Sequence, residues 1–357
     1  MDWFIVMIIF LFILDGCAVT QFKEANTPFL DKIAEEGKVS LECVAIFPTA
    51  TYTGHSTIIT GNYPEIHGMV GNQFWDRKMK CVRNFDDYDP NKNIETPTIF
   101  DLLPFPTCAI CEPVTRGASL IVEKKFFDKI SLDAQNRSIF EQLKNSVSPN
   151  IQFYMVNFQG VDGYGESAGP ESKKYLNCLE EVDGFLSVLK NLIHSDFVFM
   201  VTADHGMTTV NLNINLEEEL RIGGFQARCI ASHRCSHIYT NSNLEELEKY
   251  LRTLPFIDRV FNSTEIERVH LKHKRTGDLV VCAKKGFEFG NEKLNGSHGG
   301  ATQDEILVPF IFYDVKGELS DRISLESMSL TDICPTILDL FNIKPKVKFQ
   351  GKSLYKT

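Results

Sequence analysis

The sequence predicts an α/β fold with a mainly parallel sheet, helices on both faces of the sheet, and a small inserted α+β cap. Three observations lead to this fold class. Short apolar segments recur along the 357-residue chain, helical stretches lie between them, and the pattern changes to shorter strands between residues 211 and 289. Strands that alternate with helices are typical of parallel sheets that are covered on both sides.

The expected strands are the apolar segments Phe4–Leu14, Leu41–Phe47, Cys108–Cys111, Ile151–Phe158, Phe197–Thr202 and Leu307–Phe312. A helix is expected over Pro28–Glu36, because Thr27 is a candidate N-cap, proline suits the first helical position and Gly37 is a typical stop. A longer helix is expected over Pro170–Ile193, where leucines recur at helical spacing.

The apolar run from Trp3 to Leu14 has two interpretations. Its composition resembles an export signal, but no Lys or Arg precedes it and the run is too short to span a bilayer. It ends in Leu14-Asp15-Gly16, as expected of a buried strand that delivers a ligand to the edge of a sheet. We therefore predict a strand, a cytoplasmic protein with reduced thiols, and no membrane partner.

Charge and length limit the function and the domain organisation. With 37 Lys+Arg against 47 Asp+Glu, the net charge of −10 argues against binding of nucleic-acid polymers. The predicted domains are a catalytic core over residues 1–210 and 290–357 and an inserted cap over residues 211–289. The cap has a nearly balanced charge, so the negative charge lies in the core.

Acidic and imidazole side chains follow several of the predicted strands. Asp15 follows the first, Asp162 the fourth, and Asp204 with His205 the fifth, while His298 lies in a loop. The carboxyl ends of parallel strands meet in one crevice, so these side chains are expected to lie close together. A single Asp after a strand is more often a helix cap, but several such endings favour a two-metal site.

A threonine-rich turn lies between Phe47 and Gly61. It leads from a strand into a helix and places hydroxyl groups at a helix N-terminus, which favours an anion. A threonine beside a divalent metal ion could ionise and attack phosphorus. A capping turn without catalytic function explains this segment equally well.

The segment Thr51-Tyr52-Thr53-Gly54-His55, with Thr60–Gly68 and Asn72, resembles the nucleophile region of the nucleotide pyrophosphatase/phosphodiesterase family, within the alkaline phosphatase superfamily. Leu14–Gly16, Asp162, Thr202–Met207 and Ser297–Gly300 resemble the metal-ligand segments of this family in the same order. The resemblance implies a hydrolase of phosphodiester or pyrophosphate bonds. Its expected substrate is a small phosphate ester or a nucleotide.

The resemblance also implies roles for individual residues. Thr51 would be the nucleophile, and Asn72 would donate a hydrogen bond to a phosphoryl oxygen. Asp15, Asp204 and His205 would hold one zinc ion beside Thr51, which would also touch that ion, and Asp162 and His298 would hold the second. The implied mechanism is an in-line attack, a phosphothreonine intermediate, and its hydrolysis by water.

Glu166 departs from the family pattern, which usually has His four residues after the Asp of the second ligand segment. The carboxylate could bind metal in place of an imidazole, or water could fill the position. If it binds, four carboxylates would balance two divalent ions. We then expect weaker attraction of multiply charged phosphates and greater tolerance of Mn²⁺ or Mg²⁺ in place of Zn²⁺, because harder ligands favour harder ions.

Two other functions stay open. Gly71–Asp76 and Ser297–Gly300 also resemble phosphonoacetate hydrolase, a carbon–phosphorus hydrolase. That activity is expected to need lysines for the substrate carboxylate, and the matching stretch Cys111–Gly117 offers only Arg116. The third possibility is a relative without catalysis that binds metal or phosphate.

Residues that contact the substrate beyond the phosphoryl group are harder to predict. Phe74, Trp75 and Tyr164 are candidates for stacking on a leaving group, with core packing as the alternative. The cap offers possible anion contacts, with a solvated basic face as the alternative; these are His233, Arg234, His237, Lys272, His273, Lys274 and Arg275. The sequence does not indicate the oligomeric state.

Overall fold

The computed structural model describes residues 7–290 and 293–356. Its main body is a seven-stranded sheet in the order β2-β16-β8-β1-β7-β5-β6. The strands are β1 (Ile8–Ile13), β2 (Lys38–Val44), β5 (Thr107–Ile110), β6 (Leu120–Val122), β7 (Phe153–Asn157), β8 (Phe197–Thr202) and β16 (Leu307–Asp314). β16 is antiparallel to both β2 and β8, and the other neighbouring pairs are parallel, so the predicted mainly parallel sheet is confirmed.

Each predicted strand overlaps an observed one, but some bounds differ. β1 begins at Ile8, and the part of this prediction that falls on residues 4–6 lies outside the described residues. β2 begins at Lys38 and ends at Val44, so the predicted range Leu41–Phe47 was shifted. β2 is an edge strand with exposed residues, and it therefore lacks the continuous apolar run by which buried strands are recognised.

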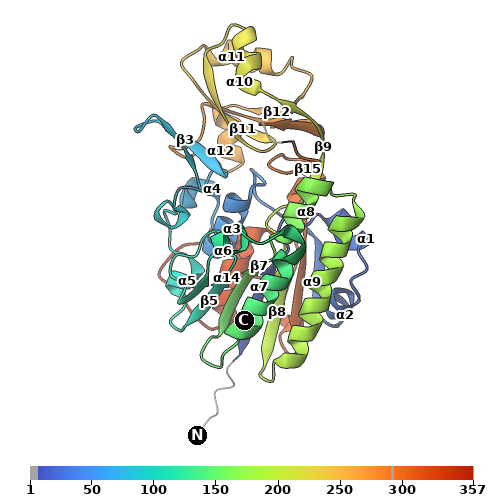
Figure 1. Cartoon of the computed structure of the whole chain (residues 1–357). Coiled ribbons are helices and arrows are strands. Elements are labelled where there is room, and N and C mark those ends of the chain that lie inside the picture. The colour runs from blue at the N-terminus through green and yellow to red at the C-terminus, as the bar shows by residue number, and fades with distance from the viewer. Residues whose placement is uncertain (1–6, 291–292, 357) are drawn as a thin grey trace.

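Helices cover both faces of the sheet (Figure 1). One group contains α1 (Val19–Glu24), α2 (Pro28–Glu36), α7 (Leu132–Ser146), α8 (Gly160–Ala168) and α9 (Lys173–Leu192), which contact one another. The other group contains α3 (Thr51–Thr60), α5 (Ile99–Leu102) and α14 (Ile333–Leu340). Shorter elements are α4 (Pro64–His67), α6 (Lys124–Phe127), α13 (Gln303–Ile306), the hairpin β3 (Gln73–Asp76) and β4 (Cys81–Asn84), and the 3-10 turns Pro90–Lys92, Ser320–Arg322 and Leu330–Asp332.

Both predicted helices are present, but their N-terminal caps or first residues differ from the prediction. α2 has the predicted bounds, but its first N–H groups are capped by the carboxylate of Asp183 on α9 rather than by the side chain of Thr27. α9 begins at Lys173, three residues later than predicted, because Ser172 caps it.

The cap forms a second sheet with its own apolar core, above the main body in Figure 1. The sheet is antiparallel and contains β10 (Ala227–Ser232), β11 (Cys235–Thr240), β13 (Leu279–Ala283) and β12 (Ile257–Phe261), with helices α10 (Leu216–Ile222), α11 (Leu244–Leu251) and α12 (Ser263–Arg268). A three-stranded sheet of β9 (Thr208–Ile214), β14 (Gly286–Phe289) and β15 (Gly296–Ser297) lies at the junction. Residue 211 lies within β9, and residue 289 ends β14.

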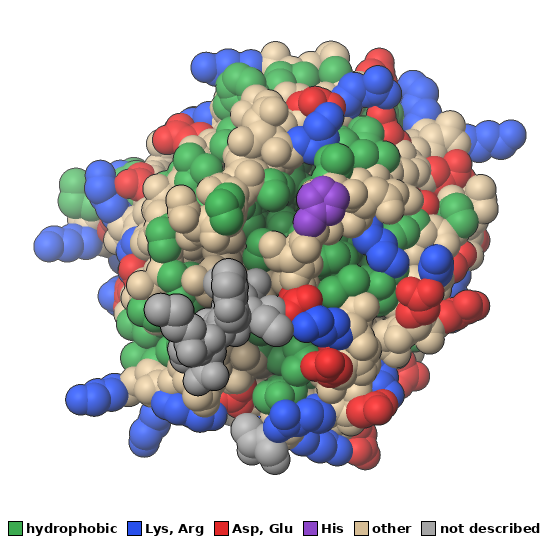
Figure 2. Space-filling view, turned by 90° about the horizontal axis from the view of Figure 1, so that it is seen from below, with side chains coloured by type: hydrophobic (Ala, Val, Ile, Leu, Met, Phe, Trp, Pro, Cys, Tyr) green, Lys and Arg blue, Asp and Glu red, His purple; other side chains and the backbone are tan. Residues whose placement is uncertain are grey.

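The surface opposite the cap carries basic and acidic side chains side by side (Figure 2). The ten cysteines are free thiols, and most of them are buried. Across residues 7–290 and 293–356, no helix is both long and apolar enough to cross a bilayer.

Candidate active site

The predicted ligands meet at the carboxyl edge of the sheet, below the cap. Asp15 follows β1, and Asp204 and His205 follow β8. Asp162 and Glu166 lie one turn apart on α8, and His298 follows β15. Since residues four apart share one face of a helix, Asp162 and Glu166 face the same site.

The first cluster surrounds the hydroxyl of Thr51. Nε2 of His205 lies 3.2 Å from Oδ2 of Asp204, 3.7 Å from Oδ1 of Asp15 and 3.3 Å from Oγ1 of Thr51. Ligand atoms about 2.0–2.2 Å from a tetrahedral zinc ion stand roughly 3.4 Å apart. These separations therefore suit donors that share one divalent ion.

The second cluster lies next to the first. Nε2 of His298 is 3.9 Å from Oδ1 of Asp162 and 4.0 Å from Oε1 of Glu166. The rings of His205 and His298 stack with their centroids 3.8 Å apart, so the two clusters adjoin. Glu166 thus lies at the second cluster, close enough to share a metal ion with Asp162 and His298.

Buried charge in the two clusters fits divalent cations. Oδ1 of Asp15, Oδ1 of Asp162 and Oδ2 of Asp204 are buried and accept no hydrogen bond from the described residues. Burial, followed by the negative charge of neighbouring carboxylates, raises the pKa of Asp15 and Asp162 well above the usual range. Burial lowers the pKa of His205 and His298, which favours the neutral imidazoles that bind metals. Cations would relieve the repulsion and satisfy the free oxygens.

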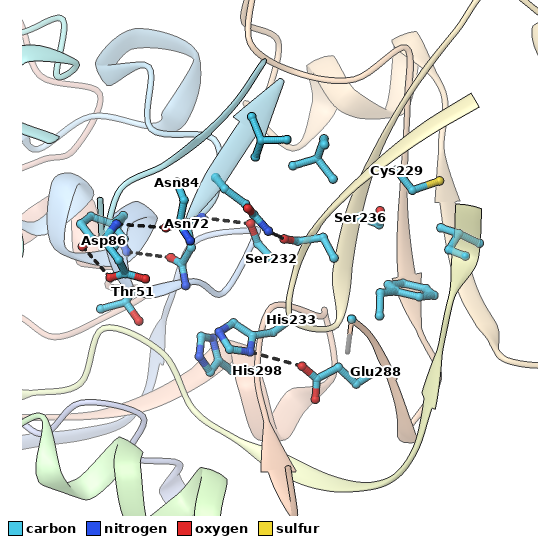
Figure 3. A pocket seen from close by; sticks show the side chains of 18 of the residues that line it. Thr51, Asn72, Asn84, Asp86, Cys229, Ser232, His233, Ser236, Glu288 and His298 are labelled. Carbon is cyan, nitrogen blue, oxygen red and sulfur yellow. Dashed lines mark hydrogen bonds and ion pairs between the residues drawn. The ribbon is translucent and has the colours of Figure 1, made fainter. Parts of the chain in front are cut away.

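Thr51 is the first residue of α3, so its hydroxyl lies at a helix N-terminus. Asn72 accepts a hydrogen bond from the N–H of Tyr52 at Oδ1, at 3.2 Å, and its own N–H donates to Oγ of Ser232 at 2.9 Å. These bonds fix Asn72 beside Thr51 (Figure 3). The side-chain NH₂ group can then serve as a donor to an anion held at Thr51.

His55 and Glu112 belong to the site, although the sequence analysis did not assign them. Nδ1 of His55 lies 2.7 Å from Oε2 of Glu112, and Nε2 lies 3.6 Å from Oδ2 of Asp204. Burial raises the pKa of Glu112. Burial lowers the pKa of His55, but the charge of Glu112, its hydrogen bond and the charge of Asp204 together raise it above the usual value. Asp15, His55 and Asp204 thus form a further group of close ligand atoms, next to the nucleophile candidate Thr51. Two features of the sequence could have indicated these residues. His55 lies one helical turn after Thr51, and Glu112 directly follows a predicted strand.

Gly54 allows α3 to approach this cluster. A Cβ atom at this position would lie 2.7 Å from the carbonyl oxygen of Asp204. Only glycine permits so close a contact between the helix and the chain after β8. The approach brings Thr51 within reach of His205.

The predicted stacking residues lie elsewhere. Phe74 is buried against Phe85, with the guanidinium of Arg275 5.0 Å from its ring centroid. The hydroxyl of Tyr164 donates to Asp133. Neither side chain lines the cavity, so their predicted contact with substrate has no support. The guanidinium of Arg228 lies over the ring of Trp75, which is likewise not part of the cavity wall.

Most cationic candidates of the cap have structural partners. Arg234 and His237 are fully buried, so they form no solvated face, and their nitrogens are hydrogen-bonded to other residues of the protein. Arg275 donates to the carbonyl oxygens of Gly68 and Asn93 and so joins the cap to the core. Lys272 pairs with Glu267, and His273 and Lys274 pair with Glu95. His233 differs, because it lies at the second cluster, 3.7 Å from Glu166.

A cavity of about 1160 Å³ opens above both clusters. Its walls come from the core and from the cap, and Figure 3 shows Asn84 and Asp86 on one side and Cys229 and Ser236 on the other. Lys124 also lines the cavity and pairs with Asp128 at 3.1 Å. The cavity is large enough for a phosphate ester with a sizeable leaving group.

A largely parallel sheet that gathers Asp and His around a threonine at its carboxyl edge defines an alkaline phosphatase-like protein. Residues 9–304 match the model of the family described as Type I phosphodiesterase / nucleotide pyrophosphatase. The chain belongs to this family, as the sequence motifs predicted.

Individual relatives agree with the family. Ectonucleotide pyrophosphatase/phosphodiesterase family member 3 of Mus musculus is 24% identical over 215 residues, which cover 56% of this chain and 25% of the relative. The chain thus spans about a quarter of the length of this relative. The predicted cytoplasmic location stays a prediction.

Two solved structures have the same fold. Human ectonucleotide pyrophosphatase/phosphodiesterase 5 superposes with a TM-score of 0.79 at 21% identity, covering 97% of both chains. Phosphonoacetate hydrolase from Sinorhizobium meliloti 1021, in complex with phosphonoformate, superposes with a TM-score of 0.75 at 20% identity, covering 92% of this chain and 94% of the other.

Proposed function

We propose that this protein is a metal-dependent hydrolase of phosphodiester or pyrophosphate bonds in small phosphate esters or nucleotides. Thr51 is the nucleophile, and Asp15, Asp204 and His205 hold one divalent ion while Asp162, Glu166 and His298 hold the second. The observation that carries the proposal is the position of Thr51, whose Oγ1 lies 3.3 Å from Nε2 of His205 at the N-terminus of α3.

The residues of the chain have distinct tasks in this reaction. Two divalent ions, with Zn²⁺ expected and Mn²⁺ or Mg²⁺ as alternatives, would supply positive charge that favours the threonine alkoxide and neutralises phosphoryl oxygens when bound. Oγ1 of Thr51 attacks phosphorus in line with the leaving group, the bond from phosphorus to the leaving oxygen breaks, and a phosphothreonine forms. Asn72 donates its amide N–H to a non-bridging oxygen, and the N-terminus of α3 favours the same negative charge. Hydrolysis of the phosphothreonine regenerates Thr51.

Hydrolysis of bis-p-nitrophenyl phosphate with added Zn²⁺ or Mn²⁺ tests the proposal. Thr51→Ala removes the nucleophile and should reduce turnover at least about a thousandfold. Thr53→Val is a matched control, because Thr53 is on the same helix and does not line the cavity, and a valine of nearly the same shape should leave turnover nearly unchanged. Full diesterase activity in Thr51→Ala would refute the nucleophile, and no activity in the metal-loaded wild type would favour a binding protein without catalysis.

One observation favours a carbon–phosphorus hydrolase as the second candidate. Arg116 pairs with Asp101 and cannot serve the substrate, but Lys124 lines the cavity and offers an ammonium group to a carboxylate. Release of inorganic phosphate from phosphonoacetate, lost in Lys124→Met, would support this activity over the diesterase. Diester turnover without such release supports the first proposal.

A further inference from the structure

The tip of the cap hairpin between β10 and β11 reaches the second cluster. Its two central residues are His233 and Arg234. His233 has a φ of 56°, in the left-handed region. Two-residue hairpins favour glycine at such a position, because a side chain there is strained. An imidazole occupies it instead and lies against the ring of His298, with the centroids 4.1 Å apart (Figure 3).

We propose that His233 is a ligand of the second divalent ion, supplied by the cap, in place of the imidazole that Glu166 replaces on α8. The inference rests on the two-metal site of the proposed function. The second ion is then held by Asp162, Glu166 and His298 from the core and by His233 from the cap.

The positions of the donor atoms support this assignment. Glu166, His233 and His298 each offer one ligand atom, and these three atoms lie within 4.8 Å of one another. Nδ1 of His233 is 3.7 Å from Oε1 of Glu166, so the imidazole lies beside the second cluster. Because Nδ1 also faces Glu288, the nitrogen that would bind the ion is Nε2. One carboxylate and two imidazoles are a ligand set that suits zinc. Asp162, whose buried Oδ1 accepts no hydrogen bond from the described residues, completes a set of four.

Glu288 on β14 holds the imidazole at Nδ1, which leaves Nε2 as the nitrogen that can bind the ion. Its Oε1 lies 3.4 Å from Nδ1 of His233, and its side chain is buried. A carboxylate that holds a histidine ring fixes the orientation of the ring and increases its basicity, as is common next to metal ligands. Glu288 is therefore a positioning residue for His233.

The hairpin tip is held in place by both of its neighbours. Oγ of Ser232 accepts the N–H of Asn72, and the N–H of Arg234 donates to the carbonyl of His298 at 2.8 Å. Gly299 permits this contact, since a Cβ atom there would lie 2.4 Å from the carbonyl oxygen of Ser232. His233 is thus fixed relative to His298, as a ligand requires.

Metal titration of the metal-free protein tests the assignment. The protein is dialysed against a chelator and titrated with ZnCl₂ in a calorimeter, and the metal content of the loaded protein is measured by mass spectrometry. His233→Gly is the informative variant, because glycine suits the left-handed backbone and should leave the Tm of the metal-free protein unchanged or higher. His270→Ala is the control, since His270 is a cap histidine that pairs with Glu65 outside the cavity.

The wild type and His270→Ala should bind two ions. His233→Gly should bind the first ion normally and the second at least about 10–100-fold more weakly. Glu288→Gln should weaken only the second ion, and by less. Equal affinities for both ions in His233→Gly and the wild type would overturn the ligand role while leaving the proposed function intact.

Two further outcomes would also overturn the assignment. A wild type that binds fewer than two ions would overturn both this inference and the two-metal site. A His233→Gly variant that loses both ions together with a lower metal-free Tm would show that His233 supports the cap rather than the metal.

Discussion

Replacing Arg234 with alanine should destabilise the protein strongly, although no step of the proposed reaction uses Arg234. The side chain is fully buried and pairs with the equally buried Glu305 at 2.9 Å. It also donates to the carbonyl oxygens of Ala283, Lys284 and Phe287. Removal of one partner of a buried ion pair costs about 3–5 kcal/mol, because the other charge stays buried.

The loss of three further hydrogen bonds places the expected cost at the upper end, about 5 kcal/mol. With an unfolding entropy of about 2.1 cal/mol/K per residue, that corresponds to a Tm lower by roughly 7 °C. Differential scanning calorimetry of Arg234→Ala measures the change in Tm, and urea unfolding measures the change in the free energy of unfolding. Arg221→Ala, at an exposed cap arginine that pairs with Glu218, is the control and should leave the Tm unchanged. A Tm within about 1 °C of the wild type in Arg234→Ala would show that the buried pair does not hold the cap hairpin.

Three other changes have defined outcomes. Burial lowers the pKa of His67 to about 3, whereas the unfolded chain takes up the proton near pH 6.5. The contribution of His67 to the free energy of unfolding should therefore be complete above about pH 6.5 and be smaller by roughly 2 kcal/mol at pH 5. Urea unfolding at both pH values measures this difference. His67→Gln should flatten this pH dependence, and an unchanged slope would contradict the role of His67. Removal of divalent ions with a chelator should lower the Tm, because the buried carboxylates of Asp15 and Asp162 lose the positive charge that offsets their repulsion. In a thermal shift assay, each ion added back at a hundred times its Kd should restore about 2.7 kcal/mol of the free energy of unfolding. Glu166→His should favour Zn²⁺ over Mn²⁺ and tighten binding of inorganic phosphate in calorimetry, since the site gains one positive charge; looser phosphate binding would speak against the charge argument.

The sequence predicted the layers of the fold because buried parallel strands leave continuous apolar runs. It could not predict the direction of β16, since an apolar run such as Leu307–Asp314 reads the same in either orientation. The bounds of the edge strand β2 were predicted wrongly, because exposed polar residues interrupt its apolar sequence and hide where the strand begins and ends.

The site divides in a similar way. Asp15, Asp204 and His205 follow strands directly, so the rule that parallel strand ends converge was enough to predict that they lie together. Glu112 obeys the same rule, but the strand before it, Thr107–Ile110, is short and gives a weaker signal. His233 was predicted only as a possible anion contact of the cap. Its position beside Glu166 and His298 could not be predicted, because it depends on how the cap sheet packs on the core, which is a contact between residues distant in sequence.

The bonds at the hairpin tip determine how the cap can move. Ser232 is joined to Asn72, and Arg234 to the loop of His298, so the cap touches both Asn72 and the second cluster. Swinging it away as a rigid lid would break these bonds and withdraw His233 as well. Turnover should therefore contain no slow opening step of the cap, and its rate should be insensitive to solvent viscosity. The size of an acceptable leaving group is then fixed by the dimensions of a permanent entrance.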